Sequence, residues 1–251
     1  MIVLRILVNA LIMAGEIAAV AGVAALGYHH PFLFAGITAA LAFALGLRLE
    51  VARLRYELPF YFGALVTPGV LLTGLVGFSE AVLKGVLAGV AALFTFSGTD
   101  PDRLYWVAVV FGICLYAGAS LLRILSIRAD ALPLRWGYFR LAPLLGLMFS
   151  GGLALLAAMA VLPGTSVGDI GWKIIFDLPP QPSVAQASEL LFQIKQAFDE
   201  FIVTVLGTAL DERLARLAAI VISVNVLSGF VSALYAALIA WGVRRAEETL
   251  L

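Results

Sequence analysis

Long apolar stretches separated by short polar segments dominate the sequence. Because about 20 helical residues span the hydrocarbon core of a bilayer, each of five stretches predicts a membrane-crossing helix. They are Ile6–Leu26, Phe32–Leu47, Leu104–Leu122, Ala142–Leu162 and Leu217–Val243. The second stretch is short, but Pro31 suits the first turn of a helix. This helix is expected to continue through the polar sequence that follows Leu47 until Pro59 ends it.

The apolar region from Phe60 to Gly98 is too long for one crossing and carries only two charges, Glu80 and Lys84. Ser79 is a plausible N-cap with an acid directly after it, so a sixth crossing helix is predicted from Glu80 to Phe96. The remaining stretch, 60–78, would then begin and end on one side of the membrane. Pro68 and Gly69 stand near its middle, where a chain reversal is expected. The stretch is therefore predicted to be a re-entrant helical hairpin, or else a helix lying along the interface.

The distribution of basic residues orients the six spans, because short cytoplasmic loops are rich in Lys and Arg. Arginines cluster in 48–55, in 123–140 and at 244–245. With one crossing in 60–98, all three clusters face the same side as both termini. Eleven of the 16 basic residues then lie on that side and five on the other. Both termini are therefore predicted to be cytoplasmic.

The segment 163–216, which separates the membrane region 1–162 from the last span and tail 217–251, is predicted to face outside. Ser183 and Gln186 form a capping box, which starts a helix predicted over 183–206. Apolar residues recur along it at heptad-like spacing, which makes it amphipathic: Leu191, Ile194, Phe198, Phe201 and Val205. The polar positions include several acids and one lysine, without the basic face typical of a lipid-surface helix. Two placements are open, one on the membrane surface and one with Phe198 and Phe201 against a partner subunit, and the missing basic face favours packing against protein.

Composition supports the same class of protein. The chain is 63% hydrophobic and 13% charged, whereas a soluble domain is near half apolar and a quarter charged. An all-α integral membrane protein of the cell (inner) membrane is therefore expected, surrounded by lipid. The net charge of zero argues against a nucleic-acid partner. One cysteine and two histidines indicate no metal or cofactor site, and no catalytic motif indicates an enzyme.

Glu16 is the sharpest chemical feature, because it stands in the middle of the first apolar stretch. Ionisable residues inside a membrane are costly and face protein or water. Asn9 lies on the same helix face, and Asn225, between Ser223 and Ser228 in the last span, is the best candidate partner. These three residues are candidates for an ion or proton site. The alternative is that they only hydrogen-bond neighbouring helices.

Glu80 and Lys84 are spaced to pair along one helix. Such a pair is either a gate, if both side chains point into a cavity, or an exposed interfacial pair of little energetic value.

Two function classes follow from the sequence. The first is a small transport protein or channel for ions or protons, oligomeric, with Glu16 as its site and the hairpin lining its path. The second is a non-catalytic structural or assembly subunit of a larger membrane complex, which would use its small-residue helix faces and outer helix as contact surfaces.

Overall fold

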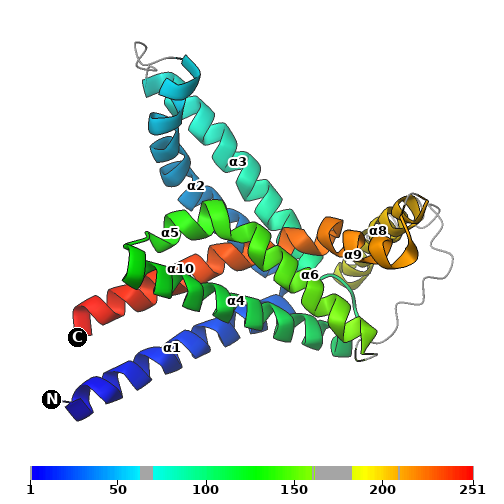
Figure 1. Ribbon diagram of the computed structural model, residues 1–251, viewed down its shortest axis with the longest axis horizontal. Helices are drawn as coiled ribbons and strands as arrows, with labels where there is room; N and C mark the ends of the chain where they lie inside the picture. The colour runs from blue at the N-terminus through cyan, green and yellow to red at the C-terminus, as the bar shows by residue number, and fades with distance from the viewer. Residues whose placement is uncertain (1, 63–69, 160, 162–182, 209, 251) are drawn as a thin grey trace.

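The computed structural model describes residues 2–62, 70–159, 161, 183–208 and 210–250. In that part of the chain all regular structure is helical (Figure 1). The first half contains α1 (Ile2–His29), α2 (Pro31–Phe62), α3 (Val70–Thr95) and α4 (Pro101–Ala129). The second half contains α5 (Pro133–Trp136), the π-helical turn η1 (Gly137–Leu141), α6 (Ala142–Ala158), α8 (Val184–Gly207), α9 (Glu212–Ile222), the 3₁₀ turn η2 (Val224–Leu227) and α10 (Ser228–Leu250).

Six helical segments of the described chain are long and apolar enough to cross a membrane, as the sequence predicts. They are Ile6–His29, Pro31–Glu57, Thr73–Thr95, Pro101–Ala129, Pro133–Ala158 and Leu217–Leu250. The two ends of the chain lie at the same end of the molecule, and α8 and α9 lie at the opposite end (Figure 1). These features fit a multi-pass membrane protein.

The third span differs from its prediction. Helix α3 begins at Val70 and passes through Ser79 without interruption, so Ser79 is not the N-cap. Its hydroxyl donates instead to the carbonyl oxygen of Val76 at 2.9 Å, one turn earlier in the same helix. Likewise α2 does not stop at Pro59 but ends at Phe62. The predicted reversal at Pro68 and Gly69 lies outside the described residues, so the re-entrant hairpin stays a prediction.

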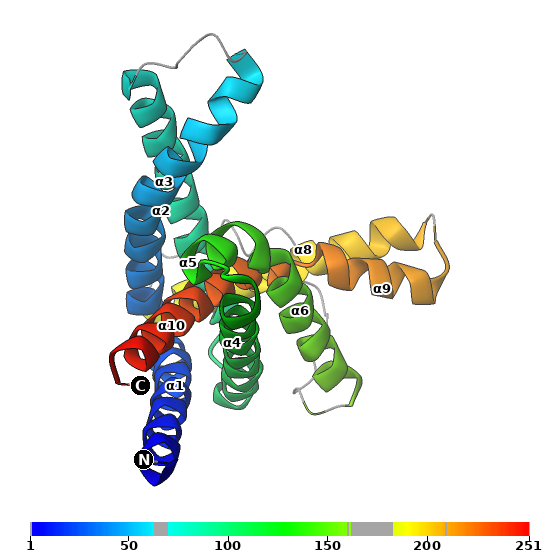
Figure 2. The same ribbon diagram turned by 60° about the vertical axis from the view of Figure 1, so that its left-hand side comes forward.

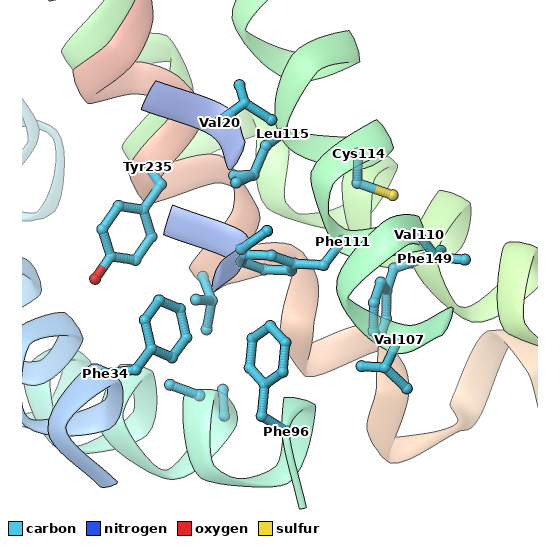
Figure 3. Packing of buried hydrophobic residues seen from close by; sticks show 14 of the residues in the cluster. Val20, Phe34, Phe96, Val107, Val110, Phe111, Cys114, Leu115, Phe149 and Tyr235 are labelled. Carbon is cyan, nitrogen blue, oxygen red and sulfur yellow. The ribbon is translucent and has the colours of Figure 1, made fainter. Parts of the chain in front are cut away.

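An aromatic cluster forms the centre of the fold, where α2, α3, α4, α6 and α10 meet (Figure 3). The Phe34 ring stacks on Tyr235 with centroids 5.4 Å apart and meets Phe96 edge-on at 5.3 Å. Phe111 packs edge-on against Phe96 at 5.2 Å and against Phe149 at 6.3 Å. Edge-to-face pairs at these distances are favourable beyond the area that they bury. The cluster therefore ties together helices that are far apart in the sequence.

Glycine allows one very close helix crossing beside this cluster. A Cβ atom on Gly229 of α10 would lie 2.2 Å from both the Ala142 carbonyl oxygen and the Gly146 nitrogen of α6. A Cβ atom on Gly146 would lie 2.3 Å from the Val226 carbonyl oxygen. Small residues permit such backbone contact between membrane helices. The start of α10 is therefore held directly against the backbone of α6.

Two pairs of helices leave the central bundle in different directions (Figure 2). One pair is α2 with α3, and the other is α8 with α9. The chain exposes 14782 Å² of surface, against roughly 10,700 Å² expected for a compact soluble protein of this size. Large apolar side chains are exposed on several helices, with Leu, Ile, Val and Phe residues among them on α1, α3, α8 and α9. The molecule therefore presents large apolar faces to its surroundings.

Candidate functional site

The last membrane span is broken. The sequence predicts one continuous helix over 217–243, but α9 ends at Ile222 and α10 begins at Ser228. Between them Ser223 has an extended conformation, with φ −49° and ψ 144°. Its side-chain oxygen accepts a hydrogen bond from the Asn225 backbone N–H at 3.1 Å. Serine side chains offer the backbone such an alternative to helical bonding, and this local bond replaces the regular ladder.

Neighbouring helices satisfy the backbone groups that the break releases. The Ser150 hydroxyl of α6 donates to the Ile220 carbonyl oxygen at 2.7 Å. The carboxylate of Asp199 on α8 accepts the Val224 backbone N–H and the Ser223 hydroxyl, each at 3.0 Å. Irregular backbone at membrane depth is tolerated only where protein or water provides partners in this way. We refer to Asp199, Ser223 and Asn225 as the break site.

Asn225 belongs to the break site and does not pair with Glu16, so the predicted partnership is wrong. Its side-chain amide donates to the Ser223 Oγ at 2.9 Å. Its Oδ1 atom is buried and has no hydrogen-bond partner among the described residues. Ser228, at the start of α10, accepts a hydrogen bond from the Thr95 hydroxyl at 2.7 Å. The break site therefore combines a carboxylate, hydroxyl groups and a buried amide oxygen that has capacity for a ligand.

Helix α8 holds Asp199 in place by docking its polar face on the bundle. The Ser188 hydroxyl donates to the Gly98 carbonyl and accepts from the Gly98 N–H, both at 3.1 Å. One turn closer to Asp199, the Arg103 guanidinium lies 3.5 Å from the ring centroid of Phe192. The predicted capping box of Ser183 with Gln186 is confirmed at the start of this helix. Two successive turns of α8 thus contact the bundle before Asp199 reaches the break.

Lys195 is the most buried charged residue of α8, with 3% of its surface exposed. Its ammonium donates to the carbonyl oxygen of Phe94, near the end of α3, at 3.2 Å. Burial, reinforced by the nearby Arg103 charge, lowers the pKa of Lys195 to about 7, although Asp199 opposes the shift. Desolvation of an ammonium has this effect because the charged form loses its hydration. Lys195 can therefore change protonation near neutral pH.

Glu16 lies in a second ionic network, at the end of the bundle where the chain termini lie. Its carboxylate is buried and lies 3.7 Å from an Arg123 guanidinium nitrogen on α4. Arg123 also forms an ion pair with Glu247 of α10. One arginine is therefore shared between two carboxylates, Glu16 and Glu247. Asn9 is exposed on α1 and is not part of this network.

A hollow of about 230 Å³ lies beside Arg123 and Glu247. Most of the residues around it are polar or charged, and Ile127 is apolar: Arg123, Ser126, Ile127, Asp130, Arg244, Glu247 and Glu248. Arg244 bridges its walls, because it pairs with Glu248 at 2.9 Å and donates to the Ser126 carbonyl oxygen at 2.9 Å. The hollow leads to the Arg123 side chain that contacts Glu16. Arg123 is therefore shared by this hollow and the Glu16 network.

Glu80 and Lys84 do not pair with each other, so the predicted pair along one helix is wrong. Glu80 binds Arg53 of α2 at 2.9 Å, and Lys84 binds Glu50 of α2. The side chain of Glu50 is fully buried, and its Oε2 atom forms an ion pair with Arg53 Nη1 at 3.1 Å. This network, which we call the α2–α3 clamp, joins α2 to α3 through ion pairs between the two helices. The two alternatives for Glu80 and Lys84, a gate and an exposed pair, both assumed that the two residues act together.

The π-helical turn η1 closes this α2–α3 clamp from the other side. The Lys84 ammonium lies 5.0 Å from the Tyr138 ring centroid and 4.9 Å from that of Phe139. The Arg53 guanidinium lies 5.3 Å from the Phe139 ring. Cations are attracted to aromatic faces at these distances. The aromatic residues that the sequence places in a basic loop therefore contact the α2–α3 clamp.

The predicted partner-contact residues of α8 divide into two groups. Phe198, Phe201 and Val205 are exposed, and Leu191 and Ile194 are half-buried. The described residues contain no group of three or more His, Cys, Asp or Glu side chains that could hold a metal ion.

Comparison of the chain with protein-family models, with curated proteins and with solved structures finds no match.

Sequence reasoning missed Asp199, Lys195, Glu50 and Arg123 as members of buried networks. One signal was present for α8, because Ser188, Lys195 and Asp199 are spaced by seven and four residues and so share a helix face. The polar type of these residues does not indicate which part of the bundle they contact. No comparable signal pairs Glu16 with Arg123, since the two residues are more than a hundred positions apart.

Proposed function

We propose that this protein is a small polytopic membrane transport protein for ions or protons, and that its last span carries the substrate site. The observation that carries the proposal is the break in this span, with the Asp199 carboxylate bound to it. Transporters form ion sites from discontinuous helices, where unwound backbone and nearby oxygen atoms take the place of water. Asp199, Ser223 and the unpartnered Asn225 Oδ1 supply such oxygen atoms.

The Glu16 network gives the same span a second ionisable group at its other end. Helix α10 contributes Glu247 to that network and begins directly after the break site. Tyr235 and the aromatic cluster lie between the two along α10. In this proposal an ion or proton that binds Glu16 or Glu247 competes with Arg123, so occupancy changes how α1, α4 and α10 are held together. The aromatic cluster closes the path until the bundle rearranges.

The orientation of the chain belongs to this proposal. The excess of Lys and Arg favours cytoplasmic termini in the cell (inner) membrane. The Glu16 network would then face the cytoplasm and the break site the outside.

Flux measurements test the proposal. Purified protein in liposomes is expected to dissipate an imposed gradient of H⁺, Na⁺ or K⁺ faster than protein-free liposomes. Asp199→Asn removes the charge of the break site and is expected to slow the flux. Glu200→Gln is the matched control, because Glu200 is the next residue of α8 and is exposed. Glu16→Gln is expected to slow flux as well. Absence of flux for all three ions would contradict the proposal.

A second candidate, a non-catalytic subunit of a larger membrane complex or homo-oligomer, is favoured by the uncovered apolar faces of α1, α3, α8 and α9. Purification in mild detergent tests this candidate. A stable assembly with other membrane subunits, together with no flux, would favour it over transport. Recovery of a single chain that transports ions in liposomes would contradict this second candidate.

A further inference from the structure

The α8–α9 arm, which we define as Val184–Gly207 with Glu212–Ile222, carries the clearest unassigned surface of the molecule. Its two helices lie side by side and extend away from the bundle (Figure 2). They lie at the end opposite to the chain termini (Figure 1). The bundle covers only one side of the arm. The type of residue on the uncovered side, apolar or polar, therefore indicates whether lipid or water surrounds the arm.

The amphipathicity of α8 is inverted relative to a helix in water. Its inward face carries Ser188, Lys195 and Asp199, and Lys195 is only 3% exposed. Its uncovered face carries Phe198, 43% exposed, and Phe201, 63% exposed. In water a surface helix turns its apolar stripe to the core and its charges to the solvent. Burial of the lysine and exposure of the phenylalanines indicate an apolar medium around the arm.

Helix α9 continues this apolar surface into the membrane. Its exposed apolar residues are Leu214, Leu217, Val221 and Ile222. The last candidate span begins at Leu217, so the apolar sequence of α9 is continuous with that of a helix apolar enough to cross a membrane. The break at Ser223 then changes the chain direction before α10 crosses the bilayer. A surface that is continuous with a lipid-facing span has lipid as its natural cover.

We propose that the α8–α9 arm lies in the bilayer interface on the side opposite to the termini, with Phe198, Phe201, Leu214 and Leu217 among the acyl chains. The break in the last span is where the chain passes from lying along the membrane to crossing it. The segment 183–222 contains five acidic and three basic residues, so it has no excess positive charge to attract anionic lipid. Its attachment is driven by apolar area, as for other interfacial helices. This inference does not depend on the transported substrate.

Depth measurements on the full chain test the proposal. Single cysteines are introduced as Phe201→Cys and Leu214→Cys in a Cys114→Ala background, and each is labelled with an environment-sensitive fluorophore. The matched control is Glu200→Cys, which is next to Phe201 and exposed on a polar position. The proteins are placed one per nanodisc in neutral phosphatidylcholine, with nitroxide-labelled lipid or aqueous iodide as quencher. One chain per disc excludes contact with a second copy.

The labels at 201 and 214 are expected to be quenched by the nitroxide lipid and protected from iodide. The label at 200 is expected to be quenched by iodide and protected from the nitroxide lipid. Addition of anionic lipid is expected to leave this pattern unchanged. Equal quenching of all three labels by iodide would overturn the proposal, because the arm would then stand in water. Protection of labels 201 and 214 from both quenchers would also overturn it, since protein and not lipid would cover the face.

Discussion

The Asp199 carboxylate of α8 accepts a hydrogen bond from the backbone N–H of Val224, which lies in the break of the last span, at 3.0 Å. Val224 is the first residue after the extended Ser223, so its N–H has no helical partner. One side chain of α8 thus completes the hydrogen bonding of the last candidate membrane span. The account of function depends on this relationship.

Replacement of Asp199 by Ala is expected to loosen the break. The Val224 N–H and the Ser223 hydroxyl both lose their acceptor, and each hydrogen bond to a charged group is worth about 1.5–3 kcal/mol. Amide hydrogen exchange of residues 219–228 is expected to rise in the variant. The Glu200→Ala variant is the control and should exchange like the unchanged protein. Equal protection of residues 219–228 in the unchanged protein and in Asp199→Ala would show that the break is held by other contacts.

The docking of α8 is expected to depend on pH through Lys195. Its pKa in the folded protein is about 7, below the value of about 10.4 for a free lysine. The undocked state therefore binds more protons between these two values, and docking strengthens as pH rises from about 7 to about 10.4. Below pH 7 both states are protonated and the dependence disappears. Hydrogen exchange of α8, corrected for intrinsic rates, measures this.

The Lys195→Met variant supplies the control for the pH measurement. It keeps the length of the side chain without its charge, so α8 should be docked firmly at pH 7 and lose its pH dependence between pH 7 and 10. If the variant retained the same pH profile as the unchanged protein, another group would be responsible.

Gly229 is expected to tolerate no side chain. A Cβ atom there would lie 2.2 Å from two backbone atoms of α6, and overpacking of this kind costs about 1–3 kcal/mol or more. The Gly229→Ala variant should therefore unfold at lower temperature in detergent. Gly242→Ala on the same helix is the control, because nothing lies within 4 Å of its Cβ position. Equal melting temperatures for the two variants would contradict the close crossing of α6 and α10.

Removal of the Lys84 charge is expected to destabilise the α2–α3 pair. Lys84→Met leaves the buried Glu50 without one of its two cations, and loss of one partner of a buried pair costs about 3–5 kcal/mol. The double variant Lys84→Met with Glu50→Leu should recover much of that loss, because it removes both charges together. Glu57→Gln, on a side chain that is 44% exposed, should change the melting temperature little. A double variant no more stable than the single one would contradict the assignment.

Most of the fold could be predicted from the sequence, because long apolar helices are recognised by their length and composition. All six spans were located, and the continuation of the second helix beyond its apolar stretch and the capping box at Ser183 are confirmed. The errors concern helix ends. Ser79 has the type of an N-cap, yet the preceding residues are apolar enough to continue the helix to Val70. Asp100 caps the start of α4, and the hydroxyl of the neighbouring Thr99 donates to Glu189 of α8.

The candidate site was harder to predict, because its parts meet only in the fold. Asn225 was identified as polar within an apolar span, but the break around it depends on Asp199 and Ser150 from two other helices. Glu16 was identified for the same reason. Its partner Arg123 belongs to the arginine cluster in 123–140, which the sequence predicts to be a cytoplasmic loop. The charge of Glu16 does not indicate which distant basic residue pairs with it. A polar residue in an apolar stretch therefore indicates a candidate site residue, but it does not indicate which residue that side chain contacts.

The most direct test of the account is the initial rate of ion or proton flux in liposomes that contain equal amounts of folded Asp199→Asn, Asp199→Glu or unchanged protein. We expect Asp199→Asn to lose about tenfold or more, in line with the loss of charged hydrogen bonds worth about 1.5–3 kcal/mol. We expect Asp199→Glu to retain part of the rate, because it keeps the carboxylate. Equal rates for all three proteins would contradict a transport site at the break in the last span.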